Sequence, residues 1–381
     1  MNHSATQLLR RNRKTPRTMQ CHFKSLAAEM QKRRVPTLKL RSSVAAVAIL
    51  AGSTGAMSAP PSYRIEPVGK SGGIQSQVIV SITDQGHILG CGKKLKSDKR
   101  VNYLKLSGGK AEPLQETGVY CGIGQANDAG EVISNSYQVP FSGVQAALWT
   151  SDGVPHDLRD LAGCDPGSGS ASVGGLNQAG QAAFVVDCRF NGQDKETGVL
   201  WRGGSRTFLE GAYPYVNDIN SQGDVIGSAV QPDGKRNVVL WKADGSAQVF
   251  LPPGGGDSYA ISLNDAGQIL AKVAPTGGQF AGVVFDGGAM RSLPACGRHA
   301  VEPVEITNDG LIAVTYGGSR EYAHTGLVQD NQCYPLESLL DASGADWTGL
   351  LVTAMNNLGV LSGFGYYKGL KRNWVATPVA R

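Results

Sequence analysis

The feature that most constrains this chain is a short motif that recurs seven times. Each copy has an apolar residue (once alanine), Asn or Thr, a polar residue, any residue and Gly. The copies begin at Ile82, Ala126, Leu176, Ile219, Leu263, Ile306 and Met355. Their glycines are spaced 44, 50, 43, 44, 43 and 49 residues apart. Such even spacing indicates an array of similar structural units.

Each repeat has the pattern of four antiparallel strands. The motif predicts a tight turn, because Gly adopts a positive φ and the Asn or Thr side chain caps the turn. The apolar segment that follows completes a β-hairpin. A third apolar strand often ends in tryptophan, as at Trp149, Trp201 and Trp241, and a fourth short strand follows. Because these tryptophans share one repeat position, we expect them to pack between blades rather than bind a ligand.

Seven such units predict an all-β fold, a seven-bladed β-propeller of four-stranded antiparallel blades, over residues 60–381. The seventh repeat ends before a fourth strand, whereas residues 63–68 precede the first repeat and belong to none. We therefore predict that this N-terminal strand pairs with residues 373–377 and closes the ring, which protects the sheet edges. An open β-solenoid is the alternative, although its repeats are usually shorter and its strands parallel.

Residues 1–59 predict a signal peptide with a long basic N-terminal extension. They hold eleven Lys and Arg residues against one acid, Glu29, and an apolar run of eight at residues 44–51. Ala56 and Ser58 fit a cleavage site, and eight apolar residues are too few to span a bilayer. A start at Met30 would give a signal of ordinary length. Twin-arginine export through residues 33–34, or a basic tail with a buried strand, remain alternatives.

The charge of the remaining chain argues against nucleic acid as a partner. Subtracting the first segment from 36 basic and 31 acidic residues leaves 25 and 30 in residues 60–381, a net charge of −5. A nucleic-acid-binding domain is expected to be basic. No apolar run is long enough for a membrane span. We therefore expect a periplasmic or secreted monomer with no nucleic-acid partner.

The cysteines support an oxidising destination. Six lie beyond the first segment: Cys91, Cys121, Cys164, Cys188, Cys296 and Cys333. An even number in an exported chain predicts disulfides. Cys164–Cys188 is the best pair, because the loop entering a blade and the end of its second strand share a face. Cys91–Cys121 would join neighbouring blades. Cys296–Cys333 follows by elimination, and the strand count leaves open whether its ends share a face. Buried free thiols are the alternative.

The repeat resembles the bacterial HAF repeats of probable extracellular repeat proteins. Residues 261–270 and 239–241 carry the resemblance best, which extends over nearly all of residues 63–381. The chain lacks the His-Ala-Phe triplet before the third strand, and residues 145–147 are its nearest form. The resemblance implies an exported protein without a defined chemistry, so it assigns no catalytic residue.

A search for chemistry finds no catalytic motif, metal-ligand spacing or cofactor fingerprint, so we predict no catalytic residue, metal or cofactor. By analogy at the level of the fold, ligands meet the loops that enter strand one and those between strands two and three. Exposed aromatic side chains there could stack on sugars or peptides, or pack the loops. The candidate binding residues are Tyr215, Asp257, Tyr259, Arg298, His299, Arg320 and Trp347.

Two functional hypotheses remain. The first is an exported, non-catalytic binding or scaffold propeller whose ligand is an unknown glycan, peptide or protein. The alternative is a propeller enzyme, such as a glycan hydrolase or lyase, with its site at the central funnel. An enzyme requires acids, bases and cations from several blades in one pocket. The residues whose convergence would favour it are Asp257, Arg298, His299, Glu302, Arg320 and Asp346.

Overall fold

The computed structural model describes residues 59–97, 99–114, 124–137, 144–274, 278–318 and 323–379. Residues 1–58 of the predicted signal peptide, together with Cys121 and Arg320, lie outside the described residues.

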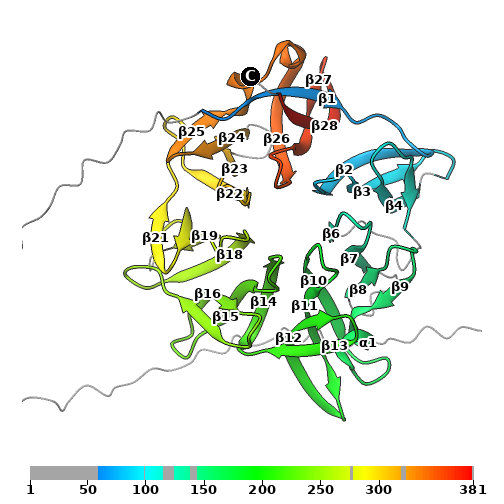
Figure 1. The fold of residues 1–381 in the computed structure, drawn as a ribbon, viewed down its shortest axis with the longest axis vertical. Helices are drawn as coiled ribbons and strands as arrows, with labels where there is room; N and C mark the ends of the chain where they lie inside the picture. The colour runs from blue at the N-terminus through cyan, green and yellow to red at the C-terminus, as the bar shows by residue number, and fades with distance from the viewer. Residues whose placement is uncertain are drawn as a thin grey trace, which may run out of the picture. The chain divides into compact units, whose positions relative to one another are not determined.

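The described chain forms seven four-stranded antiparallel sheets, arranged as blades around a central axis (Figure 1). Blade one is β2 (Ile74–Ile82), β3 (Ile88–Lys94), β4 (Arg100–Lys105) and β5 (Ala111–Pro113). Blade two is β6 (Gly124–Ala126), β7 (Val132–Tyr137), β8 (Val144–Trp149) and β9 (Pro155–Asp157). Blade three is β10 (Ser170–Leu176), β11 (Ala182–Phe190), β12 (Gln193–Arg202) and β13 (Ser205–Leu209). Blade four is β14 (Ala212–Ile219), β15 (Val225–Val230), β16 (Arg236–Trp241) and β17 (Ala247–Phe250).

Blade five is β18 (Asp257–Leu263), β19 (Ile269–Ala274), β20 (Ala281–Asp286) and β21 (Ala289–Ser292). Blade six is β22 (Val301–Ile306), β23 (Ile312–Tyr316), β24 (His324–Gln329) and β25 (Gln332–Pro335). Blade seven is β26 (Trp347–Met355), β27 (Leu361–Tyr367), β28 (Leu370–Val379) and β1 (Ser62–Pro67). The helical segments described are α1 (Leu158–Ala162), η1 (Leu336–Ser338) and η2 (Ala342–Gly344). None of the helices in the described part of the chain is long and apolar enough to cross a membrane.

The N-terminal strand closes the ring, as predicted. β1 pairs antiparallel with β28, from Ser62 opposite Val379 to Pro67 opposite Trp374. Figure 1 shows the blue β1 beside the red β28. Tyr63 is fully buried in the core between blades six and seven, so the pairing also adds packing. Blade seven is therefore assembled from both ends of the chain.

Two faces of the propeller must be distinguished. The turn face carries the motif turns, which join strands one and two of each blade. The loop face carries the connections that enter strand one and those that join strands two and three. Both are defined by strand order alone, because successive antiparallel strands alternate in direction.

Each motif builds the predicted turn. In blade three, Gly180 has φ +72° and its N–H donates to the Asn177 carbonyl. The Asn177 side-chain oxygen accepts the backbone N–H of Gln181 at 3.0 Å. All seven motif glycines have a positive φ, which explains the recurrence of Gly at this position.

The motif Asn also joins neighbouring blades, which the sequence did not reveal. The side-chain Nδ2 of Asn177 donates to the carbonyl of Asn220 at 2.9 Å, one blade further along. Asn264 makes the equivalent bond to the Thr307 carbonyl at 3.0 Å. Asn356 donates to the Thr83 carbonyl at 2.8 Å, so the series connects blade seven to blade one. One side chain thus caps its own turn and binds the next.

The polar residue after the motif Asn or Thr extends this connection. Asp265 N–H donates to the side chain of Asn308 at 2.9 Å, and Asn308 N–H donates to Asn357 at 3.0 Å. Asn357 N–H then donates to Asp84 at 2.9 Å, again across the ring closure. The turn face therefore carries bonds between blades in addition to the strand pairing within each blade.

The core lies between neighbouring blades. One cluster packs Ile133 and Leu148 of blade two against Phe184 and Val186 of blade three. The repeated tryptophan of blade two, Trp149, is 2% exposed and packs in a further cluster.

Two predicted disulfides are present, and both hold a loop that enters a blade. Cys164 and Cys188 are bonded, with Cα atoms 5.9 Å apart. Cys296 and Cys333 are also bonded, at 5.2 Å. The bond settles the open question about the second pair, because Cys333 in the four-residue strand β25 lies within reach of Cys296 in the loop that enters blade six. Gly326 leaves room, since a Cβ there would lie 2.8 Å from both sulfurs. The pair Cys91–Cys121 stays a prediction.

Candidate functional site

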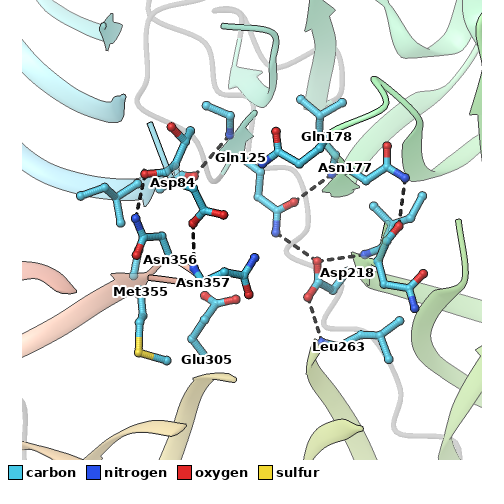
Figure 2. Close-up of a pocket in the computed structure, with 18 of the residues that line it drawn as sticks. Asp84, Gln125, Asn177, Gln178, Asp218, Leu263, Glu305, Met355, Asn356 and Asn357 are labelled. Atoms are coloured by element: carbon cyan, nitrogen blue, oxygen red, sulfur yellow. Dashed lines mark hydrogen bonds between the residues drawn. The ribbon is translucent and has the colours of Figure 1, made fainter. Parts of the chain in front are cut away.

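A polar cavity of about 170 Å³ lies at the turn-face end of the central channel (Figure 2). In five of the blades its wall includes the residue that immediately precedes the apolar residue of the motif, which we call the girdle position. Around the ring, the girdle residues are Ser81, Gln125, Gly175, Asp218, Ser262, Glu305 and Ala354. Two of the seven are therefore carboxylic acids that come from blades four and six.

Asp218 is buried and has its oxygens occupied by the protein. Its Oδ2 accepts the backbone N–H of Leu263 at 2.9 Å, and its Oδ1 accepts that of Ile219 at 2.9 Å. The Gln125 side-chain amide, from blade two, donates to Oδ1 at 3.4 Å across the channel (Figure 2). Asp218 therefore connects three blades, and its bonding is that of a structural carboxylate.

Ser262, from the blade between them, connects Asp218 to Glu305. Ser262 Oγ lies 3.3 Å from Asp218 Oδ2 and 3.1 Å from Glu305 Oε1. A hydroxyl has one hydrogen, so Ser262 can donate to only one carboxyl group at a time. Both bonds are satisfied together only if the other carboxyl group carries a proton and donates to Ser262.

The electrostatics assign that proton to Glu305. Burial, and then the neighbouring Asp218 carboxylate, raises the pKa of Glu305 to about 8. Burial also raises the pKa of Asp218, against the hydrogen bonds from Leu263 and Ile219 that favour its charged form. The two backbone N–H groups that donate to Asp218 favour placing the shared proton on Glu305, so the chain of bonds runs from the Glu305 carboxylic acid through Ser262 to Asp218.

This arrangement limits the chemistry of the channel. A catalytic pair of carboxyl groups needs both groups free to meet a substrate, and Asp218 is not. Glu305 uses Oε1 for Ser262, and no hydrogen bond of its Oε2 is found among the described residues. The same residues contain no group of three or more His, Cys, Asp and Glu side chains placed to hold a metal ion. Asp84 and Asp265 also line the cavity, and each accepts a backbone N–H from a neighbouring blade.

The structure brings two sequence-predicted residues together on the loop face through Arg236. The Arg236 guanidinium lies over the Tyr215 ring, 4.2 Å from its centroid. The Arg236 backbone N–H donates to Asp257 Oδ1 at 2.9 Å. Tyr213 lies beside them, with its carbonyl accepting from Arg236 Nη1 at 2.7 Å. We call Tyr213, Tyr215, Arg236 and Asp257 the aromatic cluster.

The other candidates are spread over blades five to seven. Tyr259 packs edge-on against Phe280, with centroids 5.5 Å apart. The His299 ring lies 6.2 Å from that of Tyr316. Trp347 is only 6% exposed and packs in the core of blade seven, so it is not placed to contact a ligand.

The remaining charged residues do not gather at the channel. Arg298 is exposed, and Glu302 forms an ion pair with Lys272. Asp346 forms an ion pair with Lys368 at 3.4 Å. None of the candidates that the structure describes lines the channel cavity, whose wall is formed by other residues.

Sequence reasoning missed Asp218 and Glu305, although a signal for them exists. When the seven motifs are aligned, the girdle position reads Ser, Gln, Gly, Asp, Ser, Glu and Ala. The residue type at this position varies from repeat to repeat, whereas the turn that follows it in the sequence is nearly the same in every repeat. Arg236 and Phe280 were missed because nothing in the local pattern marks them.

The fold and the channel define a closed seven-bladed β-propeller. No protein-family model matches the sequence, and a search of curated proteins finds no match. Among solved structures, the chain is similar to the β-propeller domain of the Trilobed protease from Pyrococcus furiosus. The TM-score is 0.53 at 8% identity, covering 79% of this chain and 94% of that one. That domain is described as having an open velcro topology, whereas β1 closes blade seven here.

Two peptidases contain a similar domain. The Pyrococcus horikoshii acylaminoacyl peptidase matches with a TM-score of 0.50 at 11% identity, covering 78% of this chain and 52% of that one. The Mycobacterium tuberculosis puromycin-hydrolyzing peptidase matches with a TM-score of 0.50 at 11% identity, covering 81% and 56%. This chain spans about half the length of each peptidase. At such identities the likeness shows the propeller fold alone.

Proposed function

We propose that this chain is an exported, non-catalytic binding propeller that meets its ligand on the loop face. The observation that carries the proposal is the aromatic cluster. Tyr213 and Tyr215 are 64% and 55% exposed, although aromatic side chains are usually buried in part. Rigid exposed rings beside a cation are a common basis of recognition.

The backbone at Tyr213 supports this interpretation. Its φ of +48° lies in the left-handed region, which is unfavourable for a residue with a side chain. Arg236 holds this conformation through its bond to the Tyr213 carbonyl. Strain kept at an exposed aromatic residue is typical of a binding site rather than of a structural turn.

The bonding of Asp218 supports the non-catalytic part of the proposal. Its contacts with three blades occupy both of its oxygens, so it is not free to act with Glu305 as a catalytic pair. A propeller enzyme remains the second candidate, because Glu305 combines an open oxygen with a pKa near neutrality.

Export is part of the same proposal. The two described disulfides fit an oxidising compartment, and the order of basic, apolar and small residues in 1–59 supports a signal peptide. We place the chain among HAF-repeat proteins on its motif. Mass spectrometry of the exported protein should find its first residue near Ala59. Peptides from residues 31–50 in that protein would overturn removal of the segment.

The binding function is tested with the exported protein on glycan and peptide arrays. For any ligand found, Tyr215→Ala should weaken binding by about tenfold or more, because it removes a stacking ring. Tyr334→Ala, on the outer strand β25, is the matched control and should leave binding unchanged. Light scattering of the same sample tests the expected monomer.

A chemical change in the bound ligand separates the two candidates. Turnover that wild-type protein performs and Glu305→Gln abolishes would overturn the non-catalytic proposal. Binding without turnover, sensitive to Tyr215→Ala, would support it.

A further inference from the structure

A second cavity lies on the loop face, where the two ends of the chain meet. It has a volume of about 670 Å³ and lies between blades seven and one. The segment that links β1 to β2 forms one wall, and the β27–β28 turn with the start of β28 forms the other. We call it the seam cavity. Its size is within the range of sites for small ligands, roughly 300–1,000 Å³.

The charge of the seam cavity is opposite to that of the domain. Four cationic side chains line it, Lys70, Lys368, Lys371 and Arg372, and no residue lining it in the described part of the chain is acidic. Residues 60–381 as a whole have a net charge of −5, from 25 basic and 30 acidic residues. Acidic residues near it include Glu66, which precedes the lining residue Pro67, and Asp346, which forms an exposed ion pair with Lys368. The cavity is therefore a local concentration of positive charge on an acidic protein.

The basic surface continues outward along blade one. Gln75 lines the cavity, and it lies opposite Lys93 of β3, which lies opposite Arg100 of β4. Residues directly opposite in antiparallel strands project from the same face of the sheet. Lys93 and Arg100 therefore extend the positive face beyond the cavity.

The floor of the cavity is polar and well supported. The buried Asn373 side-chain amide lies 2.6 Å from Ser76 Oγ, and the buried Tyr103 hydroxyl donates to Ser76 at 2.6 Å. Tyr367 and the exposed Leu370 add apolar surface to the walls. Amide and hydroxyl groups beside an aromatic ring are suited to a sugar, which has hydroxyls on its edges and apolar C–H faces.

We propose that the seam cavity binds an acidic oligosaccharide, one whose sugars carry carboxylates. The proposal rests on the proposed binding function and adds the ligand class. The four cations are distributed over two walls, so they suit several spaced anionic groups better than one phosphate. Arg372 can form a bidentate pair with a carboxylate, and the lysines supply point charges. A nucleic-acid duplex is too wide to enter a cavity of this volume.

The ligand would contact the β1–β2 segment and β28 at once. These parts of the chain belong to neighbouring blades across the ring closure. A ligand that binds only the closed ring must stabilise it by mass action. Binding of the acidic oligosaccharide should therefore raise the melting temperature of the exported protein.

The test uses calorimetric titration of the exported protein with a short oligogalacturonate at low salt. The methyl-esterified oligomer of the same length is the neutral control. The double variant Lys371→Gln/Arg372→Gln should weaken binding of the acid oligomer by about tenfold or more, since two charge-assisted contacts are lost. The esterified oligomer should bind the wild-type protein no more tightly than the acid oligomer binds the double variant. Both substituted residues are exposed, so the variant is expected to fold.

A matched variant keeps the net charge change and moves it elsewhere. Lys242→Gln/Arg291→Gln removes two exposed cations from blades four and five. Its dissociation constant for the acid oligomer should lie within about twofold of the wild-type value, because long-range attraction between exposed charges is screened. Equal loss in both double variants would show that net charge alone attracts the oligomer, and would overturn the seam site.

The remaining outcomes distinguish this inference from the proposed function. If other glycans or peptides bind and the acid oligomer does not, the inference is wrong and the binding function stands. If no arrayed ligand binds, the binding function fails as well. Equally tight, seam-dependent binding of inorganic phosphate or single-stranded DNA would replace the acidic oligosaccharide with a general anion and overturn the ligand class.

Discussion

The turn face and the loop face of this propeller are stabilised in different ways. On the turn face, strands one and two are joined by five residues in every blade, from residues 83–87 to residues 356–360. On the loop face, the segment entering a blade ranges from residues 210–211 before β14 to residues 158–169 before β10. Equal turns can repeat the same bond to the next blade, whereas unequal loops cannot. Both described disulfides hold loops of the loop face.

The comparison indicates a division of roles. The repeated bonds of the turn face stabilise the ring, and departures from the repeat carry specific properties. At the girdle position, Asp218 and Glu305 differ from the repeated pattern. On the loop face, the aromatic cluster and the seam cavity differ from it. Four measurements test this division, in order of decreasing expected effect on stability.

The largest effect should come from the turn face. Asn177→Ala removes the cap of its turn and the bond to the Asn220 carbonyl, which keeps the Gly223 N–H as its other donor. Losses of roughly 0.5–2 kcal/mol for a cap and roughly 0.5–1.5 kcal/mol for the second hydrogen bond suggest a total of up to about 3.5 kcal/mol. Urea denaturation measures it. Asn217→Ala, at an exposed site, is the control, and equal destabilisation by both variants would contradict the role of the motif.

The loop face should depend on its disulfides. Replacing Cys164 and Cys188 with serine opens a loop with a sequence separation of 24. Chain-entropy arguments predict a loss of about 3 kcal/mol. Hydrogen exchange should show lost protection at the loop that enters blade three and little change at residues 177–181. Uniform loss over both faces would show that the two are not independently stabilised.

A smaller change in the free energy of unfolding should accompany a change in pH, because Glu305 titrates. The pKa of Glu305 is raised in the folded protein, from 4.5 to about 8. The folded state therefore holds a proton that the unfolded state releases, and stability falls as pH rises from 4.5 through about 8. We expect a loss of about 1–3 kcal/mol, because Glu305 is only partly buried and solvent screening reduces the effect.

Denaturation curves across this pH range test the assignment. Glu305→Gln should remove most of the decline and be the more stable protein at pH 9. Glu210→Gln, at an exposed site, should keep the wild-type profile. An unchanged profile in Glu305→Gln would show that another group holds the proton.

The smallest effect on stability should come from the aromatic cluster. Tyr215 is more than half exposed, so Tyr215→Ala should change the free energy of unfolding by less than about 0.5 kcal/mol. Its effect on binding should exceed its effect on stability. A loss of several kcal/mol in stability would assign Tyr215 to loop packing, the alternative considered from the sequence.

The fold could be predicted because its determinants are local and repeated. A positive φ at Gly180, a capping side chain at Asn177 and alternating apolar residues each require only their own segment. Seven copies make the pattern unmistakable. The last repeat lacks a fourth strand, and residues 63–68 belong to no repeat, so these residues are predicted to supply that strand. The structure confirms this pairing.

The site could be predicted only in part. The loop face was identified by analogy, and Tyr215 and Asp257 are on it, but Trp347 is in the core. Burial of a side chain depends on which neighbouring blade covers it, and a single sequence does not contain that information. Arg236 joins Tyr215 to Asp257 through a stacking contact and a backbone bond that no spacing rule specifies.

The sequence by itself determined the number of blades, the turns and the strand that closes the ring, because each follows from short-range backbone requirements. Only the tertiary structure decided which distant residues meet. The bond between Gln125 and Asp218 joins residues 93 positions apart, and the seam cavity joins Lys70 to Lys371. Such contacts depend on the curvature that closes seven blades into one ring, and curvature is a property of packing between blades rather than of any single repeat.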